Sequence, residues 1–125
     1  MQTSFEPLEK ALQSLKNALN PAPLNDRERD GAIQRFEYTF ELSWKAAKRV
    51  LLENGIDSRA PKTVIRDLAQ QGWIEDAELW LEFLKARNAT SHSYQEEVAE
   101  NVFDHAKKFT KECEKLISIL KKNSK

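Results

Sequence analysis

Few residues in this chain interrupt regular secondary structure or cross-link it. Its 125 residues include three glycines, four prolines and one cysteine. A single cysteine cannot form an intramolecular disulfide, and with two histidines it does not make a convincing zinc-binding set. The scarcity of glycine and proline argues against a loop-rich fold and against a disordered chain. We therefore expect a regular fold without a metal site or other cofactor.

A net charge of one sign is also missing. Lysine and arginine number 20, aspartate and glutamate number 20, and the formal net charge is zero. Because such a chain cannot hold nucleic acid through bulk positive charge, any site for a polyanion must be local. Charged residues still make up 32% of the chain, which fits amphipathic helices with ion-paired, solvated faces.

Long apolar runs are absent as well. Residues 1–6 hold no basic segment leading into a hydrophobic one, and no stretch approaches the roughly 20 apolar residues of a membrane-spanning helix. We therefore predict a soluble cytoplasmic protein. Its length leaves room for one domain, residues 1–125, with one modest core.

Apolar side chains recur at steps of three and four residues through most of the chain, and this period predicts helices. The alternation typical of strands does not occur. We therefore predict an all-α fold, an antiparallel up-and-down helical bundle of four to five helices. The predicted helices are Ser4–Leu19 with Thr3 or Ser4 as the cap, a long helix from an Asn25–Glu28 capping pair to Gly55, Pro61–Gln71, one that begins near Glu75, and a last helix from Ser93 onward. The fourth of them is predicted to turn four side chains inward: Ala77, Trp80, Leu81 and Leu84.

The last predicted helix has the most regular apolar pattern. Cys113 lies on this apolar stripe, so we expect its thiol to be a buried core group. At the start of the helix, Ser93 and Glu96 match a capping box. The predicted core of the whole bundle includes Phe40, Trp44, Leu84, Phe109 and Leu116.

The segment that joins the last two predicted helices carries Arg87, Asn88, His92 and Tyr94. On an unbroken helix the side chains of Arg87 and His92 would point about 140° apart, since each residue advances about 100°. They converge only if the backbone breaks between them or if two chains share the site. The capping box at Ser93 favours a break, and it would place His92 just before a helix N-terminus, where free N–H groups favour a phosphate.

A guanidinium, an imidazole and a helix N-terminus together suit the binding and cleavage of a phosphodiester. Taken alone, the arginine–histidine pair is weak evidence, because roughly 0.3 matches to such a spacing arise by chance in this composition. Both residues could equally be ordinary polar surface. Upstream, Glu37 and Glu41 lie one turn apart, but without a matching carboxylate–histidine set they do not predict a metal site.

Two stretches of the chain resemble one known family. Arg87-Asn88-x3-His92-x-Tyr94 is similar to the R-x4-H-x-Y signature of HEPN domains that pair with minimal nucleotidyltransferases. Residues 33–45, with the sequence IQRFEYTFELSWK, resemble the second-helix motif of one branch, the nucleotidyltransferase substrate-binding protein family. The two motifs, the opening helix and the final helix fall in the family's order, so the resemblance covers nearly the whole chain.

The resemblance implies a homodimer of HEPN-like bundles whose two arginine–histidine motifs meet in a cleft at the interface. It implies a metal-independent endoribonuclease, the toxin of a toxin–antitoxin pair. Arg87 would stabilise the developing phosphorane charge, Asn88 would orient its neighbours, and His92 would act as general base or acid. The 2′-OH would attack, and the product would be a 2′,3′-cyclic phosphate. The partner nucleotidyltransferase would silence the toxin by transferring AMP to Tyr94.

A second interpretation stays open, because Arg87 and His92 serve phosphate binding and phosphate cleavage equally well. In that interpretation the chain is a non-catalytic nucleotide- or substrate-binding subunit of a two-chain nucleotidyltransferase. Both interpretations give the chain a minimal nucleotidyltransferase as partner and place RNA or a nucleotide in the dimer cleft. The sequence leaves open whether the chain is an enzyme.

Overall fold

The computed structural model describes residues 4–125, and within them every regular element is helical. This confirms the predicted all-α fold class. The five α-helices and one short 3₁₀ helix are α1 (Glu6–Leu19), α2 (Asp26–Glu53), α3 (Pro61–Gln70), α4 (Ala77–Asn88), η1 (Ala89–His92) and α5 (Glu96–Asn123).

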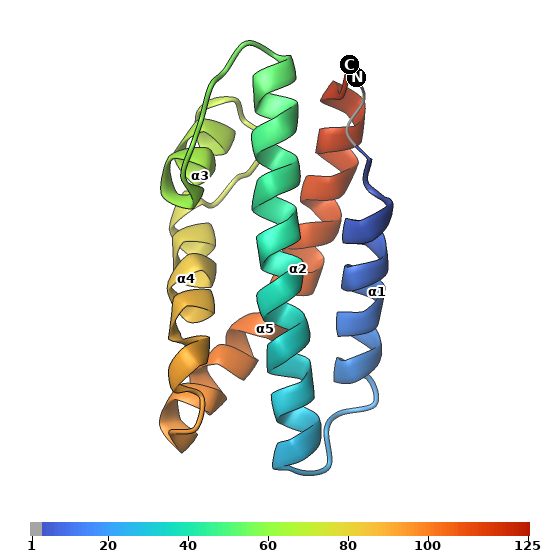
Figure 1. The fold of residues 1–125 in the computed structure, drawn as a ribbon, viewed down its shortest axis with the longest axis vertical. Coiled ribbons are helices and arrows are strands. Elements are labelled where there is room, and N and C mark those ends of the chain that lie inside the picture. Colours follow the sequence, from blue (N-terminus) through green and yellow to red (C-terminus); the bar gives the residue numbers. More distant parts are fainter. Residues whose placement is uncertain (1–3) are drawn as a thin grey trace.

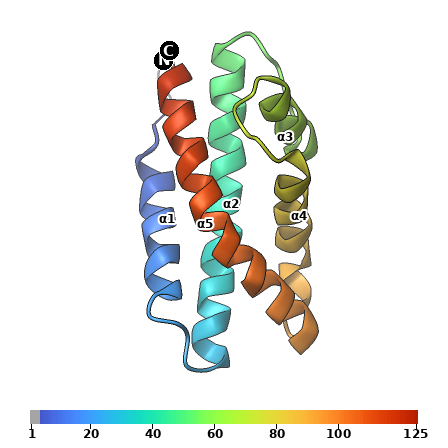
Figure 2. The same cartoon turned by 180° about the vertical axis from the view of Figure 1, so that it is seen from behind.

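The three longest helices form the body of the bundle. In Figure 1, α2 runs along the middle with α1 on one side, while α3 and α4 follow one another along its other side. Helix α5 crosses behind α2, from the end of α4 to the beginning of α1, so that the C-terminal end of α5 lies beside the start of α1 (Figure 2). No helix within residues 4–125 combines the length and the apolar character needed to cross a bilayer.

The core is built around the ring of Phe109 on α5. Its centroid lies 5.3 Å from that of Phe36 and 5.9 Å from that of Phe40, both on α2. It lies 5.7 Å from the Trp80 ring and 5.3 Å from the Phe83 ring, both on α4. All five side chains are at most 2% exposed. Edge-to-face and tilted ring pairs of this kind join three helices that are distant in sequence.

The predicted core residues are confirmed in part. Phe40, Phe109 and Leu116 are buried, but Trp44 and Leu84 are only half-buried. The predicted inward face of α4 is confirmed at Trp80, which is buried together with Phe83 and Ala86. The other residues predicted for that face are only half-buried: Ala77, Leu81 and Leu84. Apolar residues surround most of this helix, so the period alone does not determine which side faces the core.

Capping chemistry explains several of the helix ends. Asn25 Oδ1 accepts a hydrogen bond from the Glu28 N–H at 2.9 Å, which confirms the capping pair at the start of α2. Gly55 and Gly72 end α2 and α3 with φ of 83° and 77°, values that favour glycine. The prediction of Ser4 as a cap is wrong, because Phe5 occupies the N-cap of α1 and makes no side-chain cap bond. The alternative cap, Thr3, lies outside the described residues.

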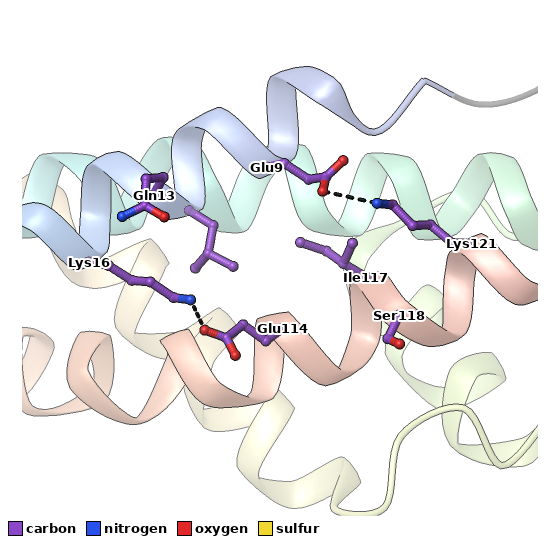
Figure 3. Close-up of a pocket in the computed structure, with 8 residues that line it drawn as sticks. Glu9, Gln13, Lys16, Glu114, Ile117, Ser118 and Lys121 are labelled. Carbon is purple, nitrogen blue, oxygen red and sulfur yellow. Dashed lines mark hydrogen bonds and ion pairs between the residues drawn. The ribbon is translucent and has the colours of Figure 1, made fainter.

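Helix α1 packs on the C-terminal half of α5. Two ion pairs cross this seam, one between Lys121 Nζ and Glu9 Oε2 at 2.9 Å and one between Lys16 and Glu114 (Figure 3). Cys113 is fully buried in α5, as predicted, and burial raises the pKa of its thiol to about 12.

Candidate functional site

The backbone breaks between α4 and α5, as predicted. The chain tightens into the 3₁₀ turn η1, and the Ser93 N–H then donates to the Thr90 carbonyl at 3.1 Å. The predicted capping box at Ser93 is wrong, because Ser93 keeps helical dihedral angles and ends this turn. The extended backbone that an N-cap requires occurs at Gln95, which makes no side-chain cap bond. His92 is therefore separated from the start of α5 by a short turn.

Arg87 lies in the last turn of α4, with 34% of its side chain exposed. Its Nη2 forms an ion pair with Glu41 Oε2 at 2.7 Å, and its Nη1 donates to Asn88 Oδ1 at 3.2 Å. Its Nε is buried and has no hydrogen-bond partner among the described residues. Helix α2 and the neighbouring asparagine thus hold the guanidinium from two directions.

A second contact from α2 holds the turn itself. The Thr90 hydroxyl hydrogen bonds to Glu37 Oε2 at 2.6 Å and lies 2.8 Å from the Arg87 carbonyl oxygen. Glu41 also pairs with Lys45 at 3.5 Å. The ion pair of Glu41 with Lys45 is expected from the sequence, but the anchoring of α4 and η1 by Glu37 and Glu41 is not. The available signal was two carboxylates one turn apart, outside the core stripe of a helix.

His92 and Tyr94 are exposed side chains of the connection between α4 and α5, residues 89–95. Their rings meet edge to face with centroids 6.1 Å apart, and Tyr94 is 79% exposed. The Tyr94 hydroxyl accepts a 3.4 Å hydrogen bond from Gln95 Nε2. Within residues 4–125, neither a hydrogen bond nor an ion pair joins Arg87 or Asn88 to His92 or Tyr94. The structure thus separates the four residues into two pairs, one in the last turn of α4 and one in the connection that follows it.

This arrangement offers the elements of phosphate chemistry. The guanidinium provides a planar set of N–H donors that matches a phosphate, and the exposed imidazole can accept or donate a proton. No cluster of three or more histidine, cysteine or acidic side chains in the described part of the chain has the geometry of a metal site.

Known proteins resemble this chain in sequence and in structure. A crystal structure from Thermus thermophilus shares 39% identity with a TM-score of 0.85, over 90% of this chain and 98% of that one. The structure of HI0074 from Haemophilus influenzae, reported to reveal the fold of a substrate binding domain of a nucleotidyltransferase, shares 29% identity with a TM-score of 0.84, over 94% and 99% of the two chains.

One curated relative, also from Haemophilus influenzae, is named "Probable ribonuclease HepT" and is 29% identical over 133 residues, covering 99% of this chain and 91% of the relative. The family model described as "Nucleotidyltransferase substrate binding protein like" matches residues 3–122. The chain therefore belongs to the nucleotidyltransferase substrate-binding protein family.

Proposed function

We propose that this protein is a metal-independent endoribonuclease of the HEPN type and the toxin partner of a minimal nucleotidyltransferase. The observation that carries the proposal is the break at η1, because an anchored Arg87 lies in the last turn of α4 just before it and an exposed His92 ends η1 itself. The ribonuclease name of a relative 29% identical supports the endoribonuclease, and the family description supports the nucleotidyltransferase as partner.

In the proposed reaction the ribose 2′-OH attacks the adjacent phosphorus and the bond to the 5′-oxygen breaks. His92 accepts the proton of the 2′-OH, and a protonated imidazole gives a proton to the leaving 5′-oxygen. Arg87 stabilises the charge that develops on the phosphorane oxygens, and Asn88 holds the guanidinium through the bond at 3.2 Å. The products are a 2′,3′-cyclic phosphate and a free 5′-hydroxyl, so the step consumes no co-reactant.

We infer that the working unit is a homodimer, because a general base and a general acid are both needed and each chain supplies one site histidine. Two copies of the connection facing each other would provide both imidazoles. Sedimentation equilibrium at micromolar concentration should give twice the chain mass of 14.5 kDa. A monomer at that concentration would contradict the shared site.

The decisive test is expression of the chain without any partner. Wild-type protein should arrest growth and cleave RNA in the presence of EDTA, whereas Arg87→Ala and His92→Ala should do neither. His105→Ala is the matched control, since this second histidine bonds to the Asn101 carbonyl on α5 and takes no part in the site. Equal activity of wild type and His92→Ala would contradict the proposal.

The family description favours a second function, a non-catalytic subunit that binds the nucleotide or substrate of a nucleotidyltransferase. Arg87, held by Glu41 and Asn88, can orient a bound phosphate without any proton transfer. Purified protein that binds nucleotide but neither cleaves RNA nor arrests growth would establish this function and exclude the ribonuclease.

A further inference from the structure

A groove of about 590 Å³ lies between α1 and α2, and neither Arg87 nor His92 lines it. Ser14 and Asn17 of α1 line one wall, and Arg27, Gly31 and Arg35 of α2 line the other. Its volume is in the range of small-ligand sites. The residues of this groove play no part in the function proposed above.

The two arginines of the groove have no acidic partner. Within residues 4–125, no carboxylate forms an ion pair with Arg27 or Arg35, and Arg27 is exposed to solvent. Arg35 is half-buried and donates only to neutral oxygens, from Nε to Ser14 Oγ at 3.0 Å and from Nη1 to the Gly31 carbonyl at 2.9 Å. A guanidinium has five N–H donors, so three of them stay available.

The neutral side chains of the groove also present donors. Ser14 Oγ accepts from both Arg35 Nε and the Tyr38 hydroxyl, so its own proton is left to donate. Asn17 Oδ1 accepts from Gln13 Nε2 at 3.0 Å, which leaves the Asn17 amide N–H groups free. The one acid that lines the groove, Glu28, uses Oε1 to accept from the Leu24 N–H at 2.9 Å.

Gly31 makes room for this arrangement. A Cβ added at Gly31 would lie 3.3 Å from Arg35 Nη1, closer than an ordinary contact. Glycine inside a helix lowers helix stability relative to alanine, so its presence here needs a local reason. The close approach of the guanidinium to the Gly31 carbonyl provides that reason and fixes the direction in which Arg35 points.

The seam between α1 and α5 is a useful contrast. Its hollow also carries two cations, Lys16 and Lys121, but each is already paired with a glutamate across the seam (Figure 3). An anion entering there would have to displace a carboxylate. In the groove between α1 and α2 neither arginine has such a competitor among the described residues, and this difference makes it the better site for an anion.

We propose that the groove formed by Ser14, Asn17, Arg27 and Arg35 binds a phosphate group of a nucleotide. Two cations and two neutral donors converge there, and phosphate oxygens accept such bonds from several directions. Tyr38, 40% exposed, stands at the edge of the groove and offers a ring on which a base can stack. The phosphate belongs either to an RNA strand or to a free nucleotide.

The position of the groove links it to the candidate active site. Arg35 and Glu37 are two residues apart, hence about 200° apart around α2. The groove and the Glu37–Thr90 contact therefore flank the same stretch of α2, with exposed Tyr38 between them. A helix with its side chains is about 10–12 Å across, so a short RNA strand can reach both. The choice of nucleotide ligands rests on the function proposed above.

The test measures binding to the full-length protein with two probes. One is a single-stranded 2′-O-methyl oligonucleotide of about ten residues, which cannot be cleaved by 2′-OH attack, and the other is ATP. Arg27→Gln and Arg35→Lys should each weaken binding by about tenfold for whichever of the two probes occupies the groove. Arg27→Gln should also lower the salt dependence of oligonucleotide binding by about 0.7 in log–log slope.

The control variant is Arg59→Gln, which removes the same charge at the opposite end of the bundle, where Arg59 pairs with Asp57. Since Arg27 makes no hydrogen bond or ion pair within the described structure, its variant tests the groove even if Arg35→Lys folds poorly. If Arg27→Gln weakens binding of the oligonucleotide alone, the groove is assigned to RNA. If it weakens binding of ATP alone, the groove is assigned to free nucleotide. Wild-type binding of both probes by Arg27→Gln would overturn the inference.

The two proposals can fail separately. If RNA cleavage depends on His92 while Arg27→Gln binds both probes normally, only the groove is refuted. If Arg27→Gln weakens binding but the wild-type protein cleaves no RNA, only the ribonuclease is refuted.

Discussion

Glu41 on α2 and Arg87 on α4 are 46 residues apart in sequence and form an ion pair of 2.7 Å. The pair is half-buried, with 29% and 34% of the two side chains exposed. Since a fully exposed ion pair contributes at most about 1 kcal/mol, we expect a modest contribution to stability from this one. Its main effect is therefore on the orientation of Arg87, and Glu41 is a positioning residue for the proposed site.

We expect Glu41→Gln to lower RNA cleavage by about tenfold to a hundredfold, because a misdirected guanidinium no longer meets the phosphorane. The loss should fall on kcat more than on KM, and the thermal midpoint should change little. The side-chain N–H signals of Arg87 in an NMR spectrum should shift, a readout independent of activity. Glu78→Gln, an exposed acid on α4, is the control. Cleavage at the wild-type rate would remove Glu41 from the site.

Phe40 should be among the most sensitive core positions. Its ring is fully buried and lies within 6.3 Å, between centroids, of Phe36, Trp80 and Phe109. Phe40→Ala should lower the free energy of unfolding by about 3–5 kcal/mol in urea denaturation. Leu52→Ala, on the same helix but 58% exposed, should cost well under half of that. A loss below about 1 kcal/mol at Phe40 would contradict the packing.

Because the thiol of Cys113 is buried, we expect the stability of the fold to depend on pH in the alkaline range. Burial raises the pKa of its thiol from 9.0 to about 12, so the folded state keeps a proton that the unfolded state releases. This contribution is fully present below pH 9 and is lost as the pH rises toward 12. Relative to Cys113→Ala, wild-type protein should lose about 1.4 kcal/mol for each pH unit in this range. Parallel curves for the two proteins would show that the thiol is accessible to water.

Tyr94 is the expected acceptor of AMP. With 79% of its surface exposed, beside His92, it can reach a partner enzyme, whereas Tyr38 is 40% exposed and donates to Ser14. An attached AMP would add bulk and negative charge near Arg87 and occupy its phosphate-binding donors. Incubation with the cognate nucleotidyltransferase, ATP and Mg²⁺ should add one or more AMP units in intact-mass spectrometry.

Tyr94→Phe should prevent this addition and leave the free protein active. Tyr38→Phe serves as the control and should still be modified. Peptide mapping that finds AMP on a different residue, or no adduct with an active partner enzyme, would exclude Tyr94 from the mechanism.

Several helix starts and ends were predictable from the sequence because local chemistry determines them. The Asn25–Glu28 pair and the glycines at positions 55 and 72 start or end helices through bonds and dihedral angles that neighbours in sequence decide. The start of α5 was not predictable in this way. Ser93 could either cap α5 or end the preceding turn, and in the structure its N–H donates to the Thr90 carbonyl within that turn.

The site was predictable only as a set of residues. Arg87, Asn88, His92 and Tyr94 were found from their spacing and from a family resemblance, and their roles stay predictions. The anchors Glu37 and Glu41 could not be identified as such, because their contacts depend on how α4 packs against α2. The same tertiary packing decided that Phe83, and not Leu84, enters the core.

The four residues from Arg87 to Tyr94 that form the candidate site are not held equally by α2, and this difference has a kinetic consequence. Arg87 and Thr90 are tied to α2, whereas the side chains of His92 and Tyr94 make no hydrogen bond or ion pair to α2 or α4 within residues 4–125. Amide hydrogens of residues 91–95 should therefore exchange with solvent far sooner than those of α4 and α2. Because only the guanidinium is tied to α2, we expect a ligand to set the distance between guanidinium and imidazole when it binds.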